Sequence, residues 1–242
     1  MNYKELLQNE EVKVFLTKGN ANLGILGYTD HSEKHCAIVA KRAGMILEKF
    51  GYSKHEIELA EFVLERKEDC KVLVEQQENG TLPIRVTHND TKLNNILFDA
   101  DTGKGLCIID LDTIMPGLAA NDFGDSIRFG AATAEEDEKD LSKMHFDISL
   151  YELYAKGYLE ETRDVLTPEE AASLAWGARL MSFECGMRFL TDYLQGDTYF
   201  KTAYPEHNLV RARTQFRLVD EMEQQFDQMI EIVAKYYRGL GR

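Results

Sequence analysis

The chain has 242 residues, of which 44% are hydrophobic and 29% are charged, and its formal net charge is −14. This length is enough for one large domain or two small ones, and the negative charge argues against nucleic acid or an anionic membrane as the main partner. The four cysteines form no Cys-x-x-Cys pair, the N-terminus lacks a signal-peptide pattern, and no apolar run approaches about 18 residues, so we expect a soluble, cytoplasmic protein whose cysteines are core residues.

Hydrophobic spacing predicts mostly helix along the chain. The expected helices cover residues 3–17, 31–50, 54–78, 134–158, 168–194 and 206–238. Capping boxes are expected at the starts of three of them, from the pairs Asp30 and Glu33, Ser53 and Glu56, and Thr167 and Glu170. Glycines indicate where three helices end, at Gly80, Gly196 and Gly239.

Short strands are predicted in the middle of the chain, at 84–86, 96–98 and 106–110. The turn Asp101-Thr102-Gly103 is typical of a hairpin and should join the last two strands. This arrangement would place the polar segment after the first strand beside the acid at the end of the third.

The most informative pattern is the run from His88 to Asn95, which reads H-x-D-x-K-x-x-N and is followed by an apolar strand ending at Asp110. Phosphoryl transfer from ATP requires a carboxylate facing the attacking hydroxyl, here Asp90. It also requires oxygen ligands for Mg²⁺, for which Asn95 and Asp110 have the right chemistry. The alternative is a solvated turn rich in Asn and Asp.

Other residues near this pattern have more than one possible role. Lys92 stands two residues after Asp90 and could touch the transferred phosphoryl group. Asp112 is either a second metal contact or a cap of its loop. The segment Asp122-Phe123-Gly124-Asp125 contains Asp-Phe-Gly, yet it follows Asp110 too late to bind the same metal. We therefore expect Asp125 to brace the run from His88 to Asn95, which is called the catalytic loop below.

Residues from about Glu61 to Tyr237 resemble the C-terminal lobe of the aminoglycoside phosphotransferase-like kinases. Within that superfamily they are similar to the sugar 1-kinases of the N-acetylhexosamine 1-kinase type. The resemblance is carried by residues 82–95, 109–117, 121–128 and 211–216. It implies ATP and Mg²⁺ as cofactors and a sugar as the substrate.

The same resemblance implies the role of each site residue. Asp90 would be the base, with His88 and Lys92 as catalytic supports. Asn95 and Asp110 would hold Mg²⁺ and the nucleotide phosphates, with Asp112 as a weaker candidate metal ligand. Arg188, Arg211 and Arg213 could meet a sugar or a phosphate, although a surface ion pair explains each of them equally well.

The part of the chain before His88 does not have the pattern of a strand-rich kinase N-lobe, which would supply the phosphate lid and its lysine. Residues 19–27 are glycine-rich but match neither G-x-G-x-x-G nor the P-loop, and Lys41 stands in a helical pattern. Residues 1–60 instead resemble the start of an HD-domain phosphohydrolase, through the segments 22–32, 35–40, 51–53 and 56–60. That family would use His35 as a metal ligand, but its His-Asp pair is missing here.

We therefore expect a mostly helical α+β fold, with a kinase-like C-lobe at 61–242 and a truncated, helical HD-like segment at 1–60 in place of the N-lobe. The expected function is ATP-dependent phosphorylation of a sugar hydroxyl, impaired by loss of the N-lobe. The alternatives are a non-catalytic remnant that binds a partner and, third, a residual HD-type phosphohydrolase. An apolar stripe within 39–50 could cover surface that an N-lobe would otherwise bury.

Overall fold

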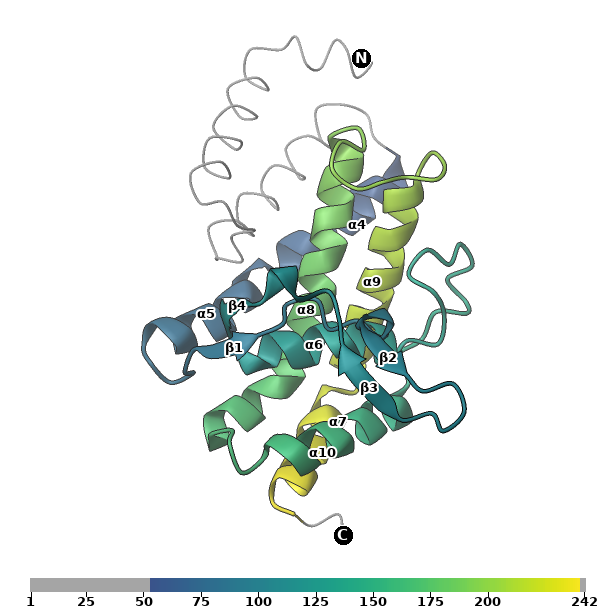
Figure 1. Cartoon of the computed structure of the whole chain (residues 1–242). Coiled ribbons are helices and arrows are strands. Elements are labelled where there is room, and N and C mark those ends of the chain that lie inside the picture. The colour runs from purple at the N-terminus through teal and green to yellow at the C-terminus, as the bar shows by residue number, and fades with distance from the viewer. Residues whose placement is uncertain (1–52, 240–242) are drawn as a thin grey trace.

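The computed structural model of the chain describes residues 53–239, and most of these are helical (Figure 1). The α-helices are α4 (Lys54–Glu65), α5 (Lys71–Glu78), α6 (Ala119–Gly130), α7 (Ile148–Thr162), α8 (Pro168–Leu194), α9 (His207–Gln224) and α10 (Phe226–Tyr237). Short 3₁₀ turns occur at η1 (Lys67–Cys70), η2 (Leu93–Asn95) and η3 (Leu111–Thr113). The predicted helices at 3–17 and 31–50 lie outside the described residues. None of the described helices is long and apolar enough to cross a membrane.

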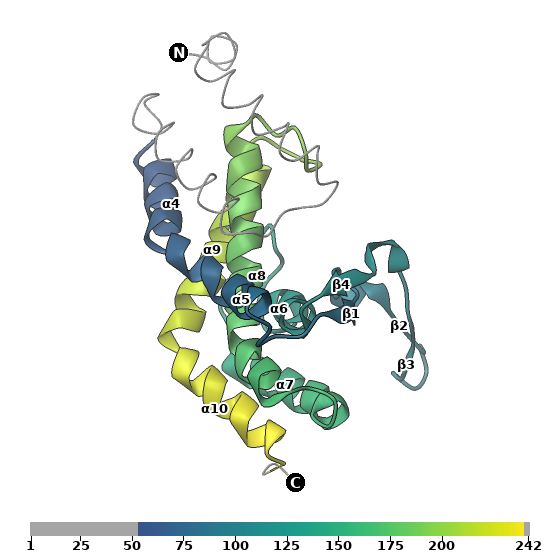
Figure 2. The same ribbon diagram turned by 90° about the vertical axis from the view of Figure 1, so that its left-hand side faces the viewer.

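Helix α8 is the longest described helix, and it packs against α5, α6, α9 and α10. Its predicted start is confirmed, because the side chains of Thr167 and Glu170 form both halves of a capping box and Pro168 occupies the first turn. It ends at Leu194, and Gly196 follows with a positive φ of 90°. Figure 2 shows the strands projecting to one side of α8, with α4 and α10 on the opposite side.

Two buried apolar clusters lie along α8. One gathers side chains of α6, α7 and α10 around the fully buried Phe123 and Tyr151. The other joins α4 to α9 around Val63, Phe183 and Phe216. Burial of such side chains supplies most of the free energy that holds the helices together, at about 25 cal/mol per Å² of apolar surface.

Helices α6 and α8 cross at a pair of glycines. A Cβ atom on Gly124 would overlap the backbone carbonyl of Gly177, and a Cβ atom on Gly177 would overlap the carbonyl of Ala120. The glycine of the Asp-Phe-Gly segment therefore permits close packing of two helices. The two glycines allow α6 to lie close to α8, and this position of α6 determines where its acidic side chains lie.

The four strands form two separate antiparallel pairs. They are β1 (Arg85–Thr87) with β4 (Met115–Gly117), and β2 (Ile96–Phe98) with β3 (Gly105–Ile108). The predicted hairpin between β2 and β3 is confirmed, with Gly103 at a φ of 66°. Strand β4 was not predicted, because three residues containing a proline show no alternation.

Large apolar side chains of the strand region face solvent within the described part of the chain. Val86 on β1 is 83% exposed and Leu106 on β3 is 63% exposed. Cys107 on β3 is also exposed, so the expectation that every cysteine is a core residue is wrong for this one, whereas Cys70 is buried. Two-stranded sheets of this kind are only marginally stable alone in water.

Three predicted helices are wrong in extent. The helix expected at 134–158 begins only at Ile148, because the Asp147 side chain caps the amides of Ser149 and Leu150. The segment before it pairs Phe146 with Ala132 as an isolated β-bridge and forms a loop. Periodicity alone did not reveal a cap inside the run.

The helices expected at 54–78 and 206–238 are each divided by a turn. The first breaks at Arg66 (φ −103°), whose side chain reaches across to Glu223 on α9. The second breaks at Gln225 (φ −115°), after which α10 turns to pack against α7 and α8. Both sides of each turn keep a helical spacing of apolar residues, so the change of direction leaves no trace in the pattern.

A bidentate ion pair ties β1 to the start of α8. Nε of Arg85 donates to Oε1 of Glu170 at 2.8 Å, and its terminal nitrogen donates to Oε2 at 2.7 Å. The Glu170 side chain is 3% exposed. The hydrogen bond from Arg85 lowers the pKa of Glu170. The pair therefore fixes the strand that leads into the catalytic loop.

We expect Glu170→Gln to destabilise the fold by about 1.5–3 kcal/mol at pH 7, the range of hydrogen bonds to charged groups. Glutamine keeps the shape and the capping position. Because the folded pKa of Glu170 lies below the ordinary value of about 4.3, the charged pair stabilises the fold above that pH and loses its contribution as the pH falls through the folded pKa.

Urea unfolding at pH 7 and at pH 3.5 measures this difference. The gap in unfolding free energy between the native chain and the variant should narrow in acid. Glu169→Gln, at an exposed position of the same helical turn, is the control and should change little at either pH. A gap that stays the same at both pH values would contradict the assignment of the stabilisation to the charge.

Candidate active site

The loop from Thr87 to Asn95 connects β1 to β2 and carries the H-x-D-x-K-x-x-N pattern. Asn89 in this loop has a left-handed backbone conformation, with a φ of 63°. Asparagine occupies this conformation more readily than most residues. The side-chain nitrogen of Asn89 donates to the carbonyl of Thr113 at 3.0 Å, which fixes the loop against η3.

The loop brings Asp90, Lys92 and Asn95 together. Nζ of Lys92 lies 2.8 Å from Oδ2 of Asp90. The side-chain nitrogen of Asn95 donates to both the backbone oxygen and Oδ2 of Asp90, each at 2.8 Å. The hydrogen bond to Asp90 raises the pKa of Lys92, so this side chain remains charged at neutral pH. The Asp90 carboxylate is thus oriented by two donors.

His88 connects the loop to the strand that precedes Asp110. Its Nδ1 accepts from the backbone N–H of Asp90 at 3.3 Å, so Nε2 carries the proton and donates to the carbonyl of Ile109 at 3.0 Å. The N–H of Ile109 in turn donates to the backbone oxygen of Asn95 at 2.9 Å. The next residue, Asp110, is therefore held close to the catalytic loop. His88 thus links this loop to Ile109, and its role as a catalytic support stays a prediction.

The predicted metal ligands differ in their setting. Asn95 is buried, and because its nitrogen is used by Asp90, its oxygen is the atom left for a cation. Asp110 is exposed, in a left-handed conformation (φ 63°) just after β3. Asp112 is exposed on η3. Among residues 53–239, no three His, Cys, Asp or Glu side chains gather as a metal-binding group. The amide oxygen and the carboxylate are nevertheless hard donors of the kind that Mg²⁺ prefers.

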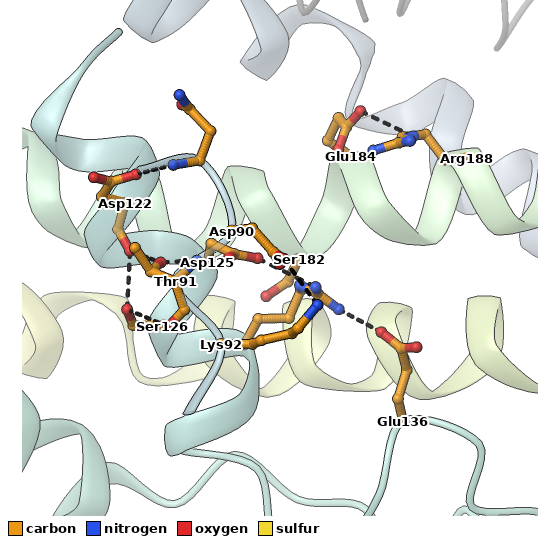
Figure 3. A network of polar contacts seen from close by, with 12 residues as sticks. Asp90, Thr91, Lys92, Asp122, Asp125, Ser126, Glu136, Ser182, Glu184 and Arg188 are labelled. Carbon is orange, nitrogen blue, oxygen red and sulfur yellow. Dashed lines mark hydrogen bonds and ion pairs between the residues drawn. The ribbon is translucent and has the colours of Figure 1, made fainter. Parts of the chain in front are cut away.

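Two carboxylates of α6 hold the backbone of the catalytic loop (Figure 3). Asp122 accepts from the N–H groups of His88 and Asn89, each at 2.8 Å. Asp125 accepts from the N–H of Thr91 at 2.7 Å. Burial raises the pKa of Asp122, and the hydrogen bonds from the two amides oppose that rise. The predicted bracing role of Asp125 is confirmed.

Helix α8 and the segment after it carry further polar and aromatic side chains in the region of the catalytic loop. Glu184 and Arg188 project from α8 (Figure 3), with Nε of Arg188 3.7 Å from Glu184. The guanidinium of Arg188 lies 5.7 Å from the ring centre of Tyr199, which is 70% exposed. The sequence named Arg188 as a candidate contact for a sugar or a phosphate, whereas Glu184 and Tyr199 belong to no spaced motif.

The other two predicted arginines belong to α9. Arg211 lies 3.7 Å from Glu136 and donates to the carbonyl of Lys201 at 3.3 Å, so it contacts protein groups in this structure. Arg213 is half-buried on the same helix. The histidines of the HD-like segment, His31 and His35, lie outside the described residues.

Residues 38–168 match the phosphotransferase enzyme family, abbreviated APH. This range is more than half of the chain. It contains every catalytic and metal-binding residue predicted above, from His88 to Asp112, together with the bracing Asp122 and Asp125. The match also includes Ala60 and Glu61, the point where the HD-like resemblance of residues 1–60 ends and the kinase-like resemblance begins. The chain belongs to the phosphotransferase enzyme family.

Proposed function

We propose that this chain is a sugar kinase of reduced activity, which transfers a phosphoryl group from ATP to a hydroxyl of an N-acetylhexosamine, at the anomeric carbon. The observation that carries the proposal is the Asp90 carboxylate, oriented by Lys92 and Asn95 in a loop that two carboxylates of α6 brace. This geometry suits a base that must face an attacking hydroxyl.

Each loop residue has a role in the proposed reaction. Asp90 accepts or orients the proton of the sugar hydroxyl, and Lys92 places a positive charge where the transferred phosphoryl group would pass. Asn95 and Asp110 would hold Mg²⁺, with Asp112 as a further candidate. The metal supplies positive charge that neutralises the phosphate oxygens.

The sugar would lie between Asp90 and the α8 side of the site. Glu184 and Arg188 offer acceptor and donor groups for its hydroxyls, and Tyr199 offers an exposed aromatic face. Such faces bind the apolar side of a sugar ring in the same way as they pack other C–H groups. The N-acetylhexosamine assignment rests on the sequence resemblance.

We expect the activity to be low because the sequence before His88 does not have the pattern of a phosphate lid and its lysine. Within that part, residues 53–87 fold as α4, η1, α5 and β1. A lid and its lysine position the phosphates and stabilise their charge, which are effects worth several kcal/mol of barrier. We expect turnover well below the roughly 1–100 s⁻¹ of typical kinases.

Transfer of labelled phosphate from ATP to N-acetylhexosamines, with Mg²⁺ and the full chain, tests the proposal. Asp90→Asn should lower the rate by about 10²–10⁴-fold, the contribution of a general base. Asp101→Asn, in the exposed β2–β3 turn, is the matched control and should leave the rate unchanged. Slow transfer that Asp90→Asn does not reduce would assign the signal to another protein in the preparation.

The second candidate is a non-catalytic lobe that binds a partner protein. The exposed apolar side chains of the strand region favour it. A full chain that binds neither sugar nor ATP, but forms a stable complex through this face, would support that function. A third candidate, a residual HD-type phosphohydrolase, rests on residues outside the described part. Stoichiometric Fe, Mn or Zn that disappears in His35→Ala would favour it.

A further inference from the structure

Glu136 occupies a junction that no motif predicted. It lies in the loop between α6 and α7, and its carboxylate meets an arginine from each side. Oε1 accepts from a terminal nitrogen of Arg128 on α6, and Oε2 lies 3.7 Å from Nε of Arg211 on α9. Its backbone oxygen accepts from the hydroxyl of Thr214 at 2.5 Å. The hydrogen bond from Thr214 therefore holds the backbone of Glu136 in place beside the two arginines.

The arm toward Arg128 leads to the catalytic loop. The Arg128 side chain is 10% exposed, and its other terminal nitrogen lies 3.2 Å from Oδ1 of Asp125. The second oxygen of Asp125 accepts from the N–H of Thr91, one residue after Asp90. A buried guanidinium needs compensating negative charge, and Glu136 supplies part of it. Loss of Glu136 would leave Asp125 as the main partner of Arg128.

The arm toward Arg211 leads to the segment that carries Tyr199. Arg211 donates to the carbonyl of Lys201 at 3.3 Å and to the side-chain oxygen of Asn208 at 3.4 Å. Asn208 donates to the buried carboxylate of Asp192 at 2.9 Å. That carboxylate also accepts from the backbone N–H groups of Thr198, Tyr199 and Phe200, at 2.9, 2.8 and 2.9 Å.

We propose that Glu136 is a positioning residue that couples the 197–201 segment to the catalytic loop. One carboxylate shared by two arginines makes the position of each depend on the other, and each arginine is bonded to one of the two segments. Ordering of the 197–201 segment by a sugar would then favour the braced form of the loop that carries Asp90. This inference rests on the sugar site described above, but the coupling itself does not require catalysis.

Hydrogen exchange of the full chain measures the coupling without an activity assay. The N–H of Thr91 reports on the catalytic loop, and the N–H of Tyr199 reports on the other segment, because each donates to a carboxylate. Glu136→Gln should speed exchange at both positions by about tenfold or more. Glu138→Gln is the matched control, because Glu138 is in the same loop and its side chain is 25% exposed, against 23% for Glu136. The control should leave both rates unchanged.

Arg211→Ala separates coupling from local support. The hydrogen bonds and the ion pair of Arg211 go to Lys201, Asn208 and Glu136, so a purely local role would speed exchange only at 197–201. Coupling through Glu136 predicts faster exchange at Thr91 as well, and this variant also serves if Glu136→Gln does not fold. Faster exchange at Tyr199 with no change at Thr91 would overturn the proposal.

Kinetics provide a second readout if the chain phosphorylates sugars. Glu136→Gln should raise KM for the sugar and lower kcat together, whereas loss of a simple support for the 197–201 segment would raise KM alone. A chain that shows coupled exchange but no transfer would retain the positioning role of Glu136 and reject the proposed kinase activity. A chain that transfers phosphate without coupled exchange would support the kinase activity and reject the positioning role of Glu136.

Discussion

Replacing Gly177 with alanine should destabilise the protein by about 3 kcal/mol or more, the upper end of the cost of overpacking a core. The added methyl group would overlap the backbone carbonyl of Ala120, and backbone atoms cannot rotate away as a side chain could. Helices α6 and α8 would have to separate. Urea unfolding of the variant measures the loss.

The same substitution should weaken the active site. Separation of the helices would displace Asp122 and Asp125 from the backbone amides that they bind in the catalytic loop. We therefore expect faster hydrogen exchange at Thr91 in whatever fraction of Gly177→Ala remains folded. That result would connect helix packing directly to the order of the loop.

Gly157→Ala is the matched control for this prediction. Gly157 is an exposed residue of α7, and a Cβ atom there would have nothing within 4 Å. Alanine is the better helix former, so this variant should be more stable by about 0.5–1 kcal/mol. Equal effects of the two substitutions would show that the crossing of α6 and α8 is not set by Gly177.

The second large effect is expected at Glu223, whose carboxylate is shared by two arginines. Arg66, at the end of α4, donates to both of its oxygens, at 2.9 and 2.8 Å. Nε of Arg179 on α8 donates to Oε1 at 2.8 Å, and Arg179 also pairs with Asp69. Burial alone would raise the pKa of Glu223, but the hydrogen bonds from Arg66 and Arg179 outweigh it and lower the pKa.

Glu223→Ala should cost about 1.5–3 kcal/mol, the range for hydrogen bonds between charged groups. The substitution removes one of the two carboxylates that compensate Arg179, whose side chain is only 8% exposed, and leaves Asp69 as the other. Glu160→Ala is the control: its pair with Lys156 spans 3.9 Å on the surface and is worth at most about 1 kcal/mol. A loss at Glu223 no larger than at Glu160 would mean that water replaces the carboxylate readily, and the ion-pair network would then contribute little to stability.

The sequence by itself determined the features that depend on neighbouring residues. Asp90, Lys92 and Asn95 lie within six residues of one another, so a single tight loop brings them into contact. The capping boxes of α4 and α8 and the β2–β3 hairpin were predictable for the same reason, because each is formed by side chains or turns a few residues apart. The membership in the phosphotransferase family is likewise a property of the sequence, because it rests on the match of residues 38–168.

Only the tertiary structure decided how that loop is supported. Asp122 and Asp125 reach its backbone from more than thirty positions away, and α6 can approach only because Gly124 and Gly177 remove two side chains from a helix crossing. The turn at Arg66 likewise depends on a distant group, because the Arg66 side chain binds the carboxylate of Glu223 on α9. Periodicity records which face of a helix is apolar, but it does not record which distant backbone or charge that face will meet. Packing makes that choice, and the choice determines the order of the catalytic loop.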